Sequence, residues 1–171
     1  MPDEARVDLT TLFTPLTELM AAAAVADPQA STPCSEWSLS DLVAHVAGVT
    51  ANFAIAAEGG APDWSTPPGQ PADASNVFEA AVQRLQKALP AAPEPIADMA
   101  CAELSVHAWD LAHALSRETA GLPPEAPERG LAFMRAGLTD AGRGEFFGPE
   151  QPAPEDADAY SLIAAFAGRT L

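Results

Sequence analysis

The chain has 171 residues, of which 24 are acidic and 8 are Lys or Arg, and its formal net charge is −16. This charge argues against nucleic acid and against an anionic membrane surface as partners, because both require clustered Lys and Arg side chains. The apolar fraction of 48% is too high for a disordered acidic chain. We therefore predict a globular protein with a single domain over residues 1–171.

The N-terminal sequence, the hydropathy pattern and the number of cysteines together indicate a cytoplasmic protein. The chain starts with the acidic run Met1-Pro2-Asp3-Glu4, which is unlike a signal peptide. We find no stretch with the ~18 apolar residues that a membrane-spanning helix needs. Cys34 and Cys101 are too few for a disulfide framework, which predicts a reducing compartment. We expect a monomer or a homodimer.

Proline and glycine divide the chain into segments that are rich in the good helix formers Ala, Leu, Glu and Arg. No run has the alternating pattern of a strand. The spacing of apolar residues predicts helices over residues 7–26, 38–58, 75–89 and 96–116, a weaker helix over 127–140 and a short one over 156–166. These elements predict an all-α fold, an antiparallel four-helix bundle with one or two short extra helices at the C-terminus. The connection over 59–74 is long enough to let the second and third helices be parallel or non-adjacent.

The start of the second helix has a clear capping signal. Ser38 is suited to cap the helix, and Asp41 stands at the third helical position, which is a variant of the capping box. Trp37 precedes the cap and is placed to pack on Leu42 as a hydrophobic staple. We therefore expect this helix to begin at a defined residue.

The chain has three histidines, and two of them stand in positions suited to a metal centre. His45 lies on or beside the apolar stripe of the second helix. Glu103 and His107 are four residues apart, so they lie on the same face of the fourth helix. Asp110 extends this polar line by one turn, whereas His113 is about 240° round the helix from His107 and points elsewhere.

Two imidazoles and a carboxylate from facing helices form a ligand set for Zn²⁺, Fe²⁺ or Ni²⁺. Three protein ligands leave a position for water or substrate, which is the catalytic pattern. Asp110 could then accept a hydrogen bond from an imidazole, or serve as a fourth ligand in a structural site. The simpler alternative is that Glu103 and His107 form a solvated pair, and that His45 is a hydrogen-bonded core residue.

Three parts of the chain resemble a known family. They are residues 32–48 (TPCSEWSLSDLVAHVAG), residues 103–112 (ELSVHAWDLA), and the tail segments 147–149 (FGP) and 165–169 (AFAGR). The chain thereby resembles the DinB/YfiT-like superfamily. It is most similar to the actinobacterial branch related to the N-terminal domain of mycothiol-dependent maleylpyruvate isomerase.

This resemblance implies a four-helix bundle that holds a divalent metal, with His45, Glu103 and His107 as its ligands. Zn²⁺ is the favoured ion, with Ni²⁺ or Fe²⁺ as alternatives. The family resemblance also implies a thiol-dependent transferase or isomerase, in which a low-molecular-weight thiol such as mycothiol becomes a metal-bound thiolate and attacks a small-molecule substrate. The alternatives are a metal-dependent hydrolase and a non-catalytic metal-binding or interaction bundle. The connection over 89–100 is shorter than the resemblance leads us to expect, and the separate C-terminal domain of the full isomerase has no counterpart here.

The remaining cysteines and tryptophans are interpreted as packing residues. Cys34 is expected to pack in the loop before the second helix, with a redox-active or nucleophilic thiol as the alternative. Cys101 is about 200° round the helix from Glu103 and should face away from the metal. Trp37 and Trp64 are expected to pack, and so is Trp109, for which a role as a wall of the metal pocket is the alternative.

Overall fold

The computed structural model describes residues 4–65, 73–144 and 147–171. Over these residues it is all-helical apart from an isolated bridge between Ser31 and Ser38. The helices are α1 (Glu4–Ala24), α2 (Leu39–Ala57), α3 (Ala74–Ala88), α4 (Glu94–Ala114), α5 (Glu125–Gly137) and α6 (Ala159–Phe166), with short 3₁₀ turns η1 (Leu89–Ala91) and η2 (Asp140–Gly142). The predicted all-α fold is confirmed, and each predicted helix end lies within three residues of the observed one.

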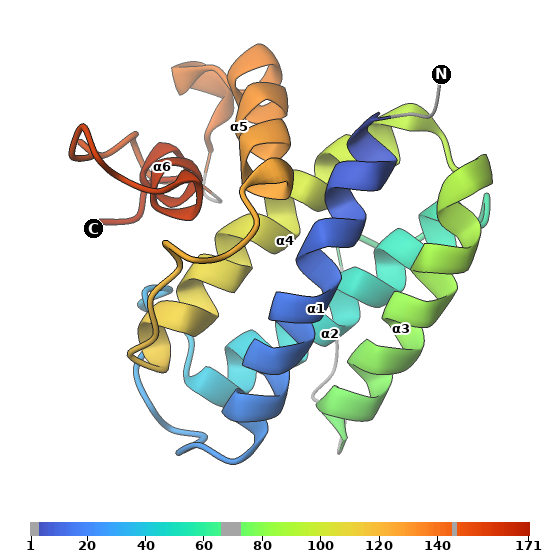
Figure 1. The fold of residues 1–171 in the computed structure, drawn as a ribbon, viewed down its shortest axis with the longest axis horizontal. Coiled ribbons are helices and arrows are strands. Elements are labelled where there is room, and N and C mark those ends of the chain that lie inside the picture. The colour runs from blue at the N-terminus through green and yellow to red at the C-terminus, as the bar shows by residue number, and fades with distance from the viewer. Residues whose placement is uncertain (1–3, 66–72, 145–146) are drawn as a thin grey trace.

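The first four helices form the bundle, and α5 and α6 pack together against α4 (Figure 1). In the bundle, α1 packs on α4, while α2 packs on both α3 and α4. Figure 1 shows α1 and α4 running in one direction and α2 and α3 running in the other. Helices α2 and α3 are thus adjacent and parallel, one of the arrangements that the long connection allowed, and the bundle does not have a simple up-down order. Residues 66–72 of that connection lie outside the described residues.

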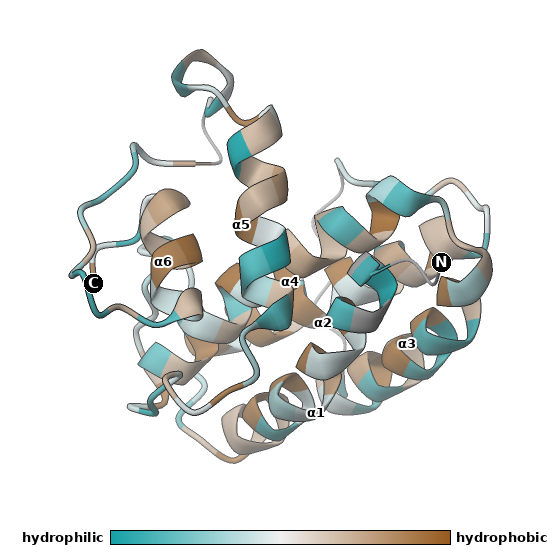
Figure 2. Ribbon diagram, turned by 45° about the horizontal axis from the view of Figure 1, so that its top comes forward, coloured by the Kyte–Doolittle hydropathy of each residue, from teal (hydrophilic) through white to brown (hydrophobic). Residues whose placement is uncertain are grey.

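Apolar side chains of the four bundle helices fill a continuous main core. A second, smaller core lies between α4, α5 and α6 and includes Val106, Leu131 and Phe166. Figure 2 shows hydrophilic and hydrophobic residues alternating along α1 and α3, as expected for helices that bury one face. Helices α4, α5 and α6 each contribute to both cores, so the C-terminal helices are packed firmly onto the bundle.

Helix α2 corrects the expectation that no stretch of the sequence is apolar enough for a membrane-spanning helix. Among the described residues, it is the one helix that is long and apolar enough to cross a membrane by length and composition. Most of that apolar stretch is buried inside the structure, where α2 packs between α3 and α4. Its composition therefore suits a central bundle helix, which is apolar over more than one face.

The predicted capping box at the start of α2 is confirmed. The Ser38 hydroxyl accepts a hydrogen bond from the backbone N–H of Asp41, and the Asp41 carboxylate accepts one from the backbone N–H of Ser38 at 3.0 Å. These bonds satisfy two N–H groups that a helix end would otherwise leave unpaired. The first turn of α2, which precedes His45, is thereby fixed.

Helix α5 approaches α4 closely at Gly130. A Cβ atom at this position would lie 2.6 Å from the Cα of Ala102 and 2.7 Å from its backbone nitrogen. Real Cβ atoms do not come so close to backbone, so the contact requires glycine. Ala102 precedes Glu103 in the sequence, and this contact fixes α5 against the middle of α4.

We expect Gly130→Ala to lower the free energy of unfolding by about 1–3 kcal/mol, because the added methyl group forces the two helices apart. This loss should exceed the roughly 1 kcal/mol that alanine gains over glycine in a helix. The matched control is Gly137→Ala in the same helix, where a Cβ would meet no atom within 4 Å. Chemical denaturation of both variants checks the prediction, and an equal effect of the two substitutions would contradict it.

Candidate metal centre

The structure brings His45 of α2 together with Glu103 and His107 of α4. The Nε2 atoms of His45 and His107 each lie 3.2 Å from the same carboxylate oxygen, Oε1 of Glu103. The three potential ligand atoms all lie within 4.8 Å of one another. The three residues that were predicted from the sequence therefore form one cluster, as a ligand set requires.

The spacing of these atoms fits a small divalent ion. A tetrahedral ion with bonds of about 2.0–2.1 Å to nitrogen and oxygen separates its ligand atoms by roughly 3.4 Å. The two N–O separations of 3.2 Å are close to this value. Two imidazoles and one carboxylate are also a ligand set that Zn²⁺, Fe²⁺ and Ni²⁺ accept. The residues present thus fit the metal that the sequence predicts.

One side of the cluster is accessible and the other is buried. The side chains of His45 and Glu103 are 23% and 32% exposed, whereas that of His107 is 8% exposed. The ring of Trp37 lies 4.6 Å from that of His45 and 6.0 Å from that of His107, between ring centroids. Trp37 therefore does more than pack near the helix start, because it forms an aromatic wall beside both imidazoles. Solvent reaches the cluster from the side of His45 and Glu103.

Asp110 holds His107 from the buried side. The Nδ1 atom of His107 lies 3.0 Å from Oδ2 of Asp110, whose side chain is fully buried. An ionised carboxylate can only accept, so Nδ1–H donates this bond, and Nε2 is the ring nitrogen that faces Glu103 and is left to bind a metal. This is the arrangement of a metal-binding histidine whose other ring nitrogen is held by a carboxylate. The structure bears out the proposed contact of Asp110 with an imidazole and does not place it as a fourth ligand.

Two further residues complete this contact, and sequence reasoning did not assign them to the site. Arg169, near the C-terminus, donates through Nε to Oδ1 of Asp110 at 3.0 Å and through Nη2 to Oδ2 at 2.8 Å. The thiol of Cys34 donates to Oδ2 of Asp110 at 3.3 Å and accepts from Nη2 of Arg169 at 3.4 Å. The available signal was that both residues lie within the segments that carry the family resemblance.

The charges around the cluster favour a bound cation. Burial alone would raise the pKa of Glu103, but hydrogen bonds from His107 and His45 outweigh it and hold the pKa well below its ordinary range. For Asp110, burial again acts to raise the pKa, yet bonds from His107 and Arg169 lower it to about 2. Burial would lower the pKa of His107, but Asp110, Cys34 and Glu103 raise it well above the ordinary value. The two carboxylates thus stay ionised and stabilise positive charge between them.

Cys34, His107 and Asp110 form a second group whose potential ligand atoms lie within 4.8 Å of one another. The guanidinium of Arg169 already contacts both the thiol and the carboxylate of this group. A cation therefore stands where a second metal would bind. Of the two groups that the described residues form, the group of His45, Glu103 and His107 has two partly exposed members and no cation of the chain in contact with its ligand atoms.

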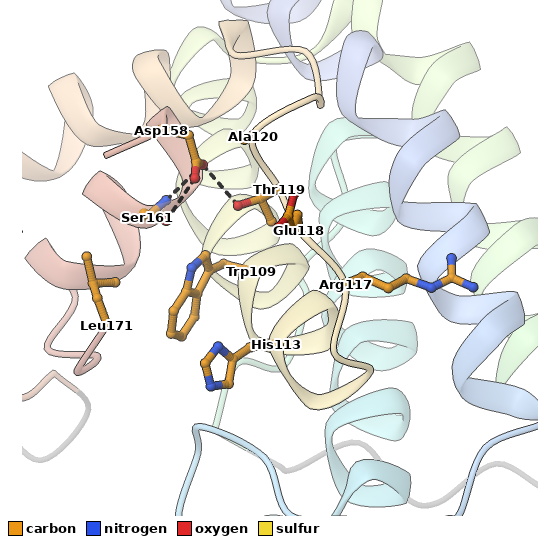
Figure 3. Close-up of a pocket in the computed structure, with 9 residues that line it drawn as sticks. All are labelled: Trp109, His113, Arg117, Glu118, Thr119, Ala120, Asp158, Ser161 and Leu171. Carbon is orange, nitrogen blue, oxygen red and sulfur yellow. Dashed lines mark hydrogen bonds between the residues drawn. The ribbon is translucent and has the colours of Figure 1, made fainter. Parts of the chain in front are cut away.

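The other residues considered from the sequence lie away from the cluster. Cys101 is buried in the main core, as predicted. His113 stacks on Trp109 with ring centroids 4.8 Å apart, and both line a separate open pocket of about 390 Å³ (Figure 3). Trp109 is buried and belongs to the main core, as predicted. Trp64 is 48% exposed and contacts Phe53, with ring centroids 5.1 Å apart.

Comparisons with known proteins agree with the features of this site. Residues 9–112 match the family model described as the mycothiol maleylpyruvate isomerase N-terminal domain. Two uncharacterized proteins of Mycobacterium tuberculosis, MT0763 of strain CDC 1551 / Oshkosh and Rv0738 of strain ATCC 25618 / H37Rv, are each 32% identical, over 82% of this chain and 84% of their own length. No solved structure matches the chain at a significant level. The matched segment contains His45, Glu103, His107 and Asp110, and the chain belongs to the mycothiol maleylpyruvate isomerase N-terminal domain family.

Proposed function

We propose that this protein is a metal-dependent enzyme that uses a low-molecular-weight thiol, of the mycothiol type, in a transferase or isomerase reaction on a small electrophilic substrate. His45, Glu103 and His107 hold the metal, and Zn²⁺ is the favoured ion. The observation that carries the proposal is the convergence of these three ligand atoms within 4.8 Å between α2 and α4, where His45 and Glu103 are partly exposed. Because a free thiol of this type requires a reducing compartment, we also propose a cytoplasmic location.

The arrangement of Asp110 supports a catalytic centre over a structural one. A structural zinc site closes its coordination shell with a fourth protein ligand, whereas a catalytic site keeps a position for water or substrate. Asp110, the residue considered for that fourth place, contacts the Nδ1 side of His107 and is paired with Arg169. The three remaining ligands are thus those of an open centre.

Each residue of the cluster has a distinct task in this proposal. A divalent ion supplies Lewis-acid chemistry that lowers the pKa of a bound thiol or water to near neutrality. Glu103 supplies the negative charge of the ligand set, and His45 joins α2 to it. Asp110 keeps the Nε2 lone pair of His107 directed toward the ligand set. Trp37 covers one side of both imidazoles, where it limits access of water and offers a flat surface to a reactant.

The metal centre is tested first by metal analysis. Wild-type protein loaded with Zn²⁺ and then desalted should retain about one ion per chain, because two imidazoles and a carboxylate bind it together. His107→Ala and Glu103→Gln should each lose most of this metal, since each removes a ligand. Elemental analysis measures the content, and thermal melts with and without a chelator measure its contribution to stability.

The matched control for these variants is His113→Ala, because His113 lies on the same helix but stacks on Trp109 away from the cluster. This variant should keep the metal content of the wild type. Undiminished metal in folded His107→Ala, or equal loss in all three variants, would count against the assigned ligands.

The thiol is tested separately with Co²⁺ in place of Zn²⁺. Mycothiol added to the Co²⁺ protein should produce a sulfur-to-cobalt charge-transfer band in the near ultraviolet, because its sulfur enters the open position. The S-methyl derivative of mycothiol should produce a much weaker band, since it cannot form a thiolate. A Co²⁺ spectrum that does not respond to millimolar mycothiol would leave the metal centre in place but overturn the thiol-dependent reaction.

A further inference from the structure

We propose that Arg169 is a positioning residue for the metal centre, which orients His107 through the carboxylate of Asp110. The C-terminal tail is then part of the centre, although the family model matches only residues 9–112. This inference rests on the proposed function for the role of His107 as a ligand. The contact between Arg169, Asp110 and His107 can also be tested without metal.

The geometry at Asp110 carries the proposal. Its buried carboxylate accepts two hydrogen bonds from the guanidinium of Arg169, and Oδ2 also accepts from His107. Such a two-point contact restricts both the position and the plane of the carboxylate. Oδ2 is therefore held where the Nδ1–H of His107 must point, and the opposite ring nitrogen is directed toward Glu103.

The fold of the C-terminal tail brings Arg169 to this place. Gly168 has a φ of +98°, which favours glycine, and a Cβ there would lie 2.7 Å from the Cα of Gly148. The buried Arg143 donates to the backbone oxygens of Gly148 at 2.9 Å and Phe166 at 2.6 Å. The two weak sequence segments of the tail, 147–149 and 165–169, thus pack against each other and form a base from which the Arg169 side chain extends to Asp110.

The charge balance gives Arg169 a role that packing alone does not require. A buried carboxylate needs compensation, and removing the cation of a buried pair leaves an uncompensated charge. With Arg169 absent, each carboxylate oxygen of Asp110 loses a hydrogen-bond donor, so the carboxylate is free to move or to find other partners. The bond that fixes the ring of His107 then changes, even where the helices stay folded.

The experiment compares Arg169→Met, Arg169→Lys, Asp110→Asn and the double variant of Arg169→Met with Asp110→Asn in the full-length chain. The matched control is Arg84→Met, because Arg84 pairs with Glu58 at an exposed position away from the cluster. Zn²⁺ affinity is measured by competition with a chelator. The ¹⁵N signals of the His107 ring are recorded in the metal-free protein, and circular dichroism reports the fold.

We expect Arg169→Met to weaken Zn²⁺ binding about 10- to 100-fold, the usual effect of losing a group that orients a metal ligand. Asp110→Asn should act similarly, and the double variant should be no weaker than the worse single one, since both changes break the same contact. Arg169→Lys should restore part of the affinity, because it keeps the charge and loses the two-point geometry. Arg84→Met should bind Zn²⁺ as the wild type does.

The His107 ring signals separate this proposal from the proposed function. Should the wild type bind no Zn²⁺, the metal centre is wrong, and the positioning of His107 is decided by whether Arg169→Met moves its ring signals in the metal-free protein. Unchanged ring signals in a folded Arg169→Met protein overturn the proposal. Should Arg169→Met fail to fold, Arg169→Lys decides it, because wild-type affinity and ring signals in that variant contradict a role for the two-point contact.

Discussion

The carboxylate of Asp110 is the point at which three distant parts of the chain meet. It is fully buried, and it accepts hydrogen bonds from Cys34 in the loop before α2, from His107 on α4 and from Arg169 in the tail. A buried charge is costly unless it is paired and hydrogen-bonded, so the carboxylate and its donors have to be present together. The direction of the His107 ring depends on this contact, and the spacing of the candidate ligands depends on that direction.

The helices and the ligands on α4 could be predicted from the sequence because both depend on local periodicity. Good helix formers between proline and glycine breakers determine where each helix lies, and Ser38 with Asp41 marks the start of α2. Residues four apart share a helix face, which places Glu103 beside His107 without knowledge of the fold. The approach of His45 from another helix was predicted from its apolar surroundings and from the family resemblance, and the cluster of the three residues bears out that juxtaposition.

The remaining features depend on contacts between distant residues, which periodicity does not encode. The parallel direction of α2 and α3 follows from the path of a long connection, about which helix spacing carries no information. Arg169 lies 59 residues from Asp110 in the sequence, and its only local signal is a short, weakly specific segment. A cysteine in a loop, such as Cys34, is typical of a packing residue. The contacts of its thiol with Asp110 and Arg169 depend on the three-dimensional fold.

The close contact of the two tail segments has a consequence for how this family diverges. Asp110, the acceptor of the ion pair with Arg169, lies inside the segment that the family model matches. Arg169, the donor, lies more than fifty residues beyond the end of that segment. The end of the segment that the family model matches is therefore not the end of the contacts that hold the site. A relative with an unrelated C-terminal segment must bring another cation to this carboxylate or replace the acid with a neutral residue, so we expect the two positions to covary across the family.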